Sequence, residues 1–187
     1  MKVTLKPIGP VDVRVLEHLR TSLSGFGDVR VADPASLPAA RLDSRKGQHR
    51  ASALFETCLA EPGDRVLGVT EAELYEGELK SVFGYAQIGG RAAVISLARL
   101  EIKPREGRAK PTILRRRAEA RRQRFLDRCV KEAVHELGHT LGLAHDSRDP
   151  ECVMHYSERV SDTDRKGQEF CPECAREASL TLRHLGT

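Results

Sequence analysis

The stretch from His135 to His145 constrains this chain more than any other, because its residues follow the pattern H-E-x-x-H-x-x-G-x-x-H. Two histidines four residues apart on a helix lie on the same face, so the imidazoles of His135 and His139 are predicted to bind one metal ion. Gly142 allows the helix to end in a left-handed turn that brings His145 back as a third ligand. Three protein ligands leave one coordination position open, which is typical of catalytic zinc sites.

Glu136 directly follows the first histidine, and its carboxylate is predicted to act as a general base. Zinc lowers the pKa of a water molecule toward neutrality, and a carboxylate beside it can take the proton and leave hydroxide to attack a carbonyl. The short pattern H-E-x-x-H also occurs on ordinary helices, where the histidines are surface or core residues. Surface or core histidines would not require a glycine and a third histidine at the spacing seen in this stretch, so we interpret the stretch as a zinc site.

A methionine and three cysteines follow the histidine stretch. Met154 comes nine residues after the last histidine, and this spacing resembles the methionine turn of the metzincin metallopeptidases, an apolar floor beneath three imidazoles. Cys152 stands two residues before the methionine, and Cys171 and Cys174 form a C-P-E-C run soon after it. The arrangement resembles the archaemetzincins, a metzincin branch with a second, cysteine-bound zinc.

The resemblance implies a metzincin-like zincin fold and a zinc-dependent peptidase with two zinc ions per chain. It is specific for residues 135–174, and upstream it rests on length and general layout. By this resemblance, the first zinc is bound by His135, His139 and His145, and Glu136 is the general base. Met154 forms the methionine turn. The second zinc is bound by Cys152, Cys171 and Cys174.

The chain departs from the archaemetzincin pattern at one ligand position. Archaemetzincins usually place a cysteine directly after the third histidine, whereas this chain has Asp146 there. Zinc accepts carboxylate oxygens as well as thiolates, so Asp146 is the favoured fourth ligand of the second site. Cys129 on the preceding helix is the next candidate, and His155 or water are further options. A metal-free pair of reduced thiols at Cys171 and Cys174 is the remaining alternative.

Length and composition favour a single soluble domain. A chain of 187 residues with 40% hydrophobic and 31% charged residues is long enough for its own core. We expect an α/β (α+β) fold: a twisted mixed β-sheet with packed helices, a long active-site helix and a small C-terminal lobe. The single catalytic domain, 1–187, is expected to comprise an N-terminal subdomain, 1–142, and a C-terminal subdomain, 143–187.

Hydrophobic periodicity places the elements along the chain. Alternating or short apolar runs predict strands at 3–8, 28–32, 65–70, 82–88 and 92–98. Helical spacing predicts helices at 13–23, 51–59, 112–141 and 175–185. A polar turn is expected at 43–47, a polar loop or short helix at 161–168, and a metal knuckle at 171–174.

Two features are candidates for contact with a substrate. Segments 82–88 and 92–98 form a predicted hairpin, and by resemblance to the metzincins its edge strand pairs with the substrate backbone. The alternative is a hairpin that only completes the sheet. Tyr156 lies in a Met-His-Tyr run that resembles the astacin branch of metzincins, in which the tyrosine hydroxyl lies near zinc and can stabilise an oxyanion. Packing in a pocket wall is the alternative for Tyr156.

Residues 103–128 contain 11 Lys or Arg against three acidic residues, although the whole chain carries only +4. The run lacks interleaved aromatic residues and matches no base-reading motif, so we expect a solvated helix face with a flexible lead-in and no nucleic-acid partner. Four arginines fall on the same helical stripe as the ligands, which suggests a basic cleft rim that favours acidic substrates. They are Arg117, Arg121, Arg124 and Arg128.

The chain is expected to be a cytoplasmic monomer without membrane contact. No apolar run reaches membrane-spanning length, and no secretion signal opens the sequence. Five cysteines, an odd number with three near the expected metal sites, fit thiolate ligands in a reducing compartment better than a disulfide framework.

The function predicted from these residues is a zinc-dependent metallopeptidase that hydrolyses bonds in peptides or proteins. Two alternatives are a non-catalytic zinc-binding docking module and a zinc hydrolase that acts on a non-peptide amide. Glu136 discriminates against the docking module, because a docking fold has no need of a carboxylate at the open metal position.

Overall fold

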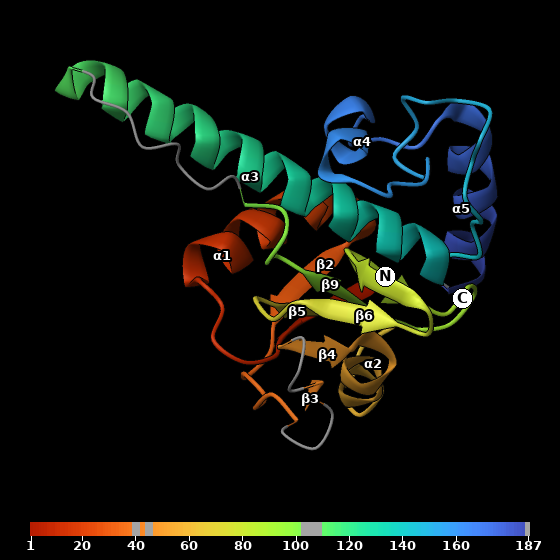
Figure 1. Ribbon diagram of the computed structural model, residues 1–187. Helices are drawn as coiled ribbons and strands as arrows, with labels where there is room; N and C mark the ends of the chain where they lie inside the picture. The colour runs from red at the N-terminus through yellow and green to blue at the C-terminus, as the bar shows by residue number, and fades with distance from the viewer. Residues whose placement is uncertain (39–41, 44–46, 102–109, 186–187) are drawn as a thin grey trace.

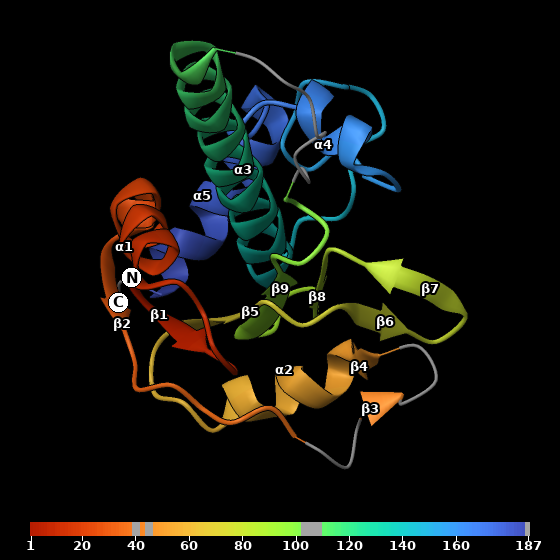
Figure 2. The ribbon, with the colours of Figure 1, turned by 60° about the vertical axis from the view of Figure 1, so that its left-hand side comes forward.

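The computed structural model describes residues 1–38, 42–43, 47–101 and 110–185. Its larger sheet has five strands in the order β2-β1-β5-β9-β8 (Figures 1 and 2). The first four strands in this order are parallel, and β8 is antiparallel to β9. The strands are β1 (Lys2–Pro7), β2 (Asp28–Val31), β5 (Arg65–Thr70), β8 (Gly84–Ala86) and β9 (Ala92–Ser96).

Helices cover both faces of this sheet. Side chains alternate along a strand, so Leu67 of β5 faces one core cluster and Val66 faces the other. The first cluster is shared with α1 (Val13–Ser22) and α3 (Pro111–Thr140), and the second with α2 (Ala51–Leu59). Burial on both faces explains why the central strands read as nearly continuous apolar runs.

A second, smaller sheet has the order β3-β4-β6-β7. Its strands are β3 (Leu42–Asp43), β4 (Gln48–Arg50), β6 (Leu74–Glu76) and β7 (Leu79–Val82). These strands have two to four residues, too few for a hydrophobic period to stand out, and the sequence analysis missed this sheet. Only Phe83 separates β7 from β8, so the chain passes directly from one sheet to the other.

Helix α3 positions the histidine stretch. It begins at Pro111, where the missing amide hydrogen costs no helical hydrogen bond. Leu126 is the first buried side chain of the helix, and from there the helix runs through the core. The chain turns away at Gly142, whose φ of +95° is the left-handed conformation that the sequence predicted.

In Figure 1 the chain after α3 first lies on the side of that helix away from the sheets, and its last helix then runs past the C-terminal end of α3. It includes the short helix α4 (Val160–Arg165) and the terminal helix α5 (Pro172–Leu185). Cys174 and Ala178 of α5 join the same core cluster as the sheet and α3. No helix in the described part of the chain combines the length and apolar character needed to cross a membrane.

The expected mixed α/β architecture with a long active-site helix is confirmed, and three local predictions are corrected. The predicted strand 82–88 contains the end of β7 and a short β8, separated by Phe83. The predicted knuckle 171–174 is mostly helical, because α5 begins at Pro172. Arg128 does not line a basic rim: it is buried and pairs with Asp164. Residues 103–109 of the predicted flexible lead-in and residues 44–46 of the predicted turn at 43–47 fall outside the described residues.

Candidate active site and metal centres

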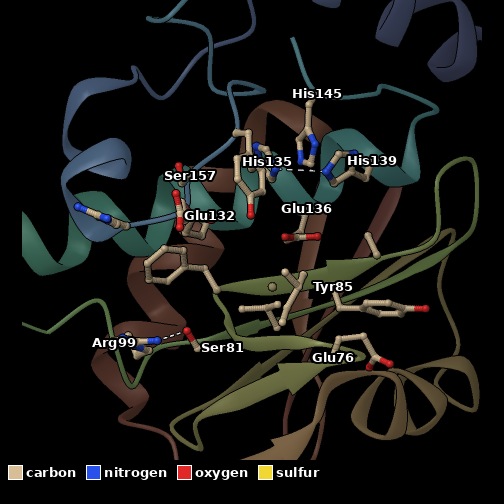
Figure 3. A pocket seen from close by; sticks show the side chains of 18 of the residues that line it. Glu76, Ser81, Tyr85, Arg99, Glu132, His135, Glu136, His139, His145 and Ser157 are labelled. Carbon is tan, nitrogen blue, oxygen red and sulfur yellow. Dashed lines mark hydrogen bonds between the residues drawn. The ribbon is translucent and has the colours of Figure 1, made fainter. Parts of the chain in front are cut away.

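Three histidines converge at the C-terminal end of α3. His135 and His139 lie one turn apart, with 3.2 Å between their Nε2 atoms. The turn at Gly142 brings His145 to them, and one nitrogen from each of the three rings lies within 4.8 Å of the others. Figure 3 shows the three imidazoles gathered above Glu136. The structure thus brings together the three residues that the sequence pattern singled out.

Backbone carbonyls orient two of these imidazoles. Nδ1 of His135 lies 2.8 Å from the oxygen of Val153, and Nδ1 of His139 lies 2.8 Å from the oxygen of Leu143. A carbonyl oxygen only accepts, so each Nδ1 donates its hydrogen and each Nε2 presents a lone pair. Two acceptor atoms 3.2 Å apart repel one another unless a cation lies between them. This donor set therefore fits a shared metal ion.

The environment keeps these imidazoles neutral, as metal ligation requires. Burial is the largest effect and lowers the pKa of His135 well below its usual value. Burial also lowers the pKa of His139, and it lowers that of His145 to about 4. The lone pairs are therefore available at neutral pH.

Glu136 is buried beside the triad, and one of its two carboxylate oxygens, Oε2, has no hydrogen-bond partner among the described residues. Its side chain is 5% exposed, and no described residue contacts Oε2 within hydrogen-bonding distance. Burial raises the pKa of Glu136 well above its usual value, and the nearby charge of Glu132 raises it further. A carboxylate with a raised pKa and a free oxygen is suited to accept a proton.

Gly84 on β8 makes room for this carboxylate. A Cβ atom built on Gly84 would lie 2.3 Å from Oε1 of Glu136, closer than such atoms ever approach. The sequence analysis did not single out Gly84, although a glycine inside a strand often marks a close approach of this kind.

We expect Gly84→Ala to lower kcat/KM for peptide cleavage by about 100-fold, because displacement of a catalytic group by about 1 Å has an effect of that size. Zinc content should not change, since the alanine touches none of the histidines. Gly25→Ala is the matched control, because a Cβ atom there meets no atom within 4 Å and its backbone is not left-handed. Equal activity of Gly84→Ala and wild type would show that catalysis does not depend on the space that Gly84 leaves for the Glu136 carboxylate.

Met154 is fully buried and packs against α3 at Gly138. Its Sδ would be 2.4 Å from a Cβ atom on Gly138, so the glycine between the two helical histidines allows the sulfur to approach α3. The oxygen of Val153 next to it anchors His135, and the oxygen of Met154 accepts a hydrogen bond from the amide of Asp146. The methionine segment thus braces both the first histidine and the start of the second cluster.

A second cluster contains three thiols and one carboxylate. Ligand atoms of its four residues lie within 4.8 Å of one another. Its members are Asp146, Cys152, Cys171 and Cys174. Cys129 is fully buried in the apolar core outside this cluster, and Nδ1 of His155 lies 2.9 Å from the backbone oxygen of Asp146. Of the candidates for a fourth position, the structure places Asp146 among the cysteines.

Arg148 hydrogen-bonds both oxygens of Asp146, most closely Oδ1, and Oδ2 also faces the thiols, with Nη2 of Arg148 3.3 Å away. Oδ1 accepts hydrogen bonds from the amide of Arg148 at 2.9 Å and from its Nε at 3.0 Å. Oδ2 lies 3.2 Å from Sγ of Cys171 and 3.7 Å from Sγ of Cys174. The hydrogen bonds from Arg148 hold the pKa of Asp146 well below its usual range, so this carboxylate is ionised at neutral pH.

A cleft of about 710 Å³ opens over Glu136 and the histidines. One wall is the run from β7 through β8, and the opposite wall includes Tyr156 and the residues after it. Tyr156 is half exposed, with its ring centroid 5.1 Å from that of His145. Strand β8 is the free edge of the five-stranded sheet. The cleft therefore has an open strand edge along one side and the triad at its base.

A buried ion pair lies at the wall of the cleft, which Glu132 lines, and it was not predicted from the sequence. Nζ of Lys166 is 3.1 Å from Oε1 of Glu132, and the Thr163 hydroxyl donates to the same oxygen at 2.9 Å. Nζ of Lys166 also lies 3.5 Å from Nδ1 of His135. The pair joins two segments 34 residues apart in sequence, so no local pattern could reveal it.

The chain was compared with known families and relatives. The family model described as peptidase family M54 matches residues 55–179. The archaemetzincin of Halobacterium salinarum is 34% identical over 182 residues, which cover 94% of this chain and 98% of that protein. This chain belongs to peptidase family M54. Another M54 relative, the archaemetzincin of Methanopyrus kandleri, is 38% identical over 176 residues, covering 92% of this chain and 89% of that protein.

Solved structures named as archaemetzincins share the fold. The crystal structure of the protein from Methanopyrus kandleri has a TM-score of 0.79 at 34% identity and covers 100% of this chain and 96% of that one. The protein from Archaeoglobus fulgidus, complexed with malonate, has a TM-score of 0.77 at 32% identity, with 95% and 99% covered. The resemblance to archaemetzincins, the zincin-type fold and the prediction of a zinc metallopeptidase are thus confirmed at the level of family M54.

Proposed function

We propose that this M54 peptidase cleaves peptide bonds with zinc held by His135, His139 and His145 and with Glu136 as general base. The observation that carries the proposal is the convergence of three neutral imidazoles beside a buried carboxylate with an unpartnered oxygen. Zinc, when bound, polarises the scissile carbonyl and lowers the pKa of water toward neutrality.

The chain's own residues supply the proton transfers and the alignment. Glu136 takes a proton from the attacking water and later delivers it to the leaving amine. The open edge of β8 pairs with the backbone of an extended peptide, which lays the scissile bond across the triad. The Tyr156 hydroxyl, on the opposite wall, stabilises the negative charge that develops on the carbonyl oxygen.

The methionine turn at Met154 serves as the floor of this site, and the chain works as one catalytic domain, 1–187, with subdomains 1–142 and 143–187. Three reduced thiols gathered in one cluster support the expectation of a reducing, cytoplasmic location. A monomer that acts on peptides or proteins, without a membrane, remains our expectation.

Metal removal tests the proposed catalytic centre. Treatment with a chelator should lower cleavage of a mixed peptide library by about 100-fold or more, and added zinc should restore it. His139→Gln should not recover on addition of zinc, because it lacks one ligand. Recovery of activity in the chelated wild type on addition of zinc is the control, because it shows that chelation did not destroy the protein. Cleavage that persists without metal would reject the zinc mechanism.

We further propose that the second cluster binds another zinc through Cys152, Cys171, Cys174 and one oxygen of Asp146. Oδ2 is the ligand oxygen, because it is the oxygen that faces Cys171 and Cys174, whereas Oδ1 accepts the two shorter hydrogen bonds from Arg148. A site with three thiolates and one carboxylate is closed, as structural zinc sites are. Such a site would clasp the loop after the triad to the start of α5.

Asp146→Ala should lower the zinc content from about two to about one per chain, because structural zinc needs four ligands. Asp146→Cys should retain about two, since it restores a four-thiolate site. Cys129→Ala is the control for the rejected ligand and should also retain about two. Metal analysis of the dialysed proteins measures the result. Full zinc retention in Asp146→Ala, or loss in Cys129→Ala, would contradict the assignment.

A further inference from the structure

The first half of α3 projects from the body of the molecule. Figure 1 shows it extending past α1 and α4, and its first buried side chain is Leu126. We call residues 110–124 the basic arm; all of its residues are exposed except Arg121, which is half-buried. At 1.5 Å per residue its helical part is about 21 Å long. A helix that is exposed on every side gains little from packing, so its sequence must serve another purpose.

Positive charge dominates the basic arm. Its cations are Lys110, Arg115, Arg116, Arg117, Arg121, Arg122 and Arg124, and its one acidic residue is Glu119. Hydrogen bonds from Arg14 and Arg128 lower the pKa of Asp12 and Asp164, and the more distant charges of Arg122 and Arg124 lower these pKa values further. None of the arm's arginines forms an ion pair with another described residue. The like charges of Arg117 and Arg121, four residues apart, destabilise an isolated helix, and an anionic partner would remove that repulsion.

Five of the arm's six arginines occupy two opposite sides of the helix, and Arg116 lies between them. At about 100° per residue, Arg115 and Arg122 share one side, whereas Arg117, Arg121 and Arg124 share the other. A helix of this kind fits between two rows of negative charge. The major groove of duplex DNA is about 12 Å wide and admits an α-helix between its two phosphate backbones.

The apolar residues of the arm argue against a membrane surface. Ile113 and Leu114 are its large apolar side chains, and by helical position they lie on the same side as Arg117, Arg121 and Arg124. Membrane-surface helices separate an apolar face from a charged one. The arm has no such separation, and its charge fits a rigid double row of phosphates better.

We propose that the basic arm docks this protein on the phosphate backbone of duplex DNA without sequence preference. The sequence analysis expected no nucleic-acid partner, because the basic run lacks interleaved aromatic residues and base-reading motifs. Contacts to the phosphate backbone need neither feature, so that expectation does not apply to this kind of binding. The arm is continuous with the helix that carries His135, about 27 Å from Arg117 along the axis. Proteins bound to the same duplex would lie near the cleft.

Fluorescence anisotropy with a labelled duplex of about 25 base pairs tests the proposal at salt concentrations from about 50 to about 200 mM. The variant Arg117→Gln/Arg121→Gln/Arg124→Gln should bind at least about tenfold more weakly, and its salt slope should fall by about 2 to 3. Glutamine keeps good helix propensity, so the arm should remain helical, which circular dichroism verifies. Zinc content and cleavage of short peptides should match wild type, because the arm is remote from the cleft.

The matched control, Arg14→Gln/Arg20→Gln/Arg176→Gln, removes three exposed arginines outside the arm and changes the net charge equally. It should bind duplex within about twofold of wild type, since it leaves the phosphate contacts intact. Equal weakening of both variants would overturn the proposal, because net charge alone would then explain the binding. So would a wild type that fails to bind duplex at low salt, or that binds phosphatidylserine vesicles more tightly than duplex.

Discussion

Replacement of Glu136 by glutamine is expected to lower kcat/KM for peptide cleavage by a factor of about 10² to 10⁴, the contribution of a positioned general base. Glutamine has nearly the same shape, so the space left by Gly84 still holds it. Its amide cannot accept the proton of the attacking water. The ligands are untouched, and zinc content should equal that of wild type.

Glu158→Gln is the control for this substitution. Glu158 lines the same cleft but is exposed, away from the buried carboxylate. It should cleave within about threefold of wild type, as expected for a surface group outside the proton path. Cleavage rates on a mixed peptide library and metal analysis should be measured on all three proteins. Undiminished cleavage by zinc-loaded Glu136→Gln would reject Glu136 as the general base.

The second large effect is expected on stability. Lys166→Met should lower the free energy of unfolding by about 3 to 5 kcal/mol, because it leaves the buried carboxylate of Glu132 without its cation. Lys166 is 1% exposed and Glu132 is 2% exposed, so water cannot replace the lost partner. Methionine fills a similar volume, and the change is therefore mainly one of charge.

The double variant Lys166→Met/Glu132→Gln is the matched control, because it removes both charges and should recover most of the stability. Denaturant unfolding of the zinc-saturated proteins gives the three free energies. A single variant within about 1 kcal/mol of wild type would show that the pair is not held as two charges. A double variant less stable than the single one would show that shape, and not charge, is what Lys166 contributes.

Much of the catalytic centre could be predicted from the chain because its parts are close in sequence. His135 and His139 are four residues apart, so helix geometry alone places them on one face. Gly142 and His145 follow within one turn, and the structure has the left-handed backbone expected at the glycine. The long strands and helices were also predictable, since each carries several periods of its hydrophobic pattern.

The fourth ligand of the second cluster could not be predicted from the sequence. Asp146 and Cys129 remained alternatives, because both residues lie close to the histidine stretch along the chain. Packing separates them: Cys129 is fully buried in the core outside the cluster, whereas Asp146 faces the cysteines and is hydrogen-bonded by Arg148. Which face of a helix meets the core depends on elements far away in sequence.

The sequence by itself determined the family, the histidine triad and the general base, because these follow from spacing within one helix and its terminal turn. Only the tertiary structure decided what surrounds them. The approach of Gly84 to Glu136, the pairing of Lys166 with Glu132 and the projection of the basic arm all depend on long-range packing. Such contacts join segments that are far apart in the chain, and the local sequence of one segment does not indicate which other segment it will contact.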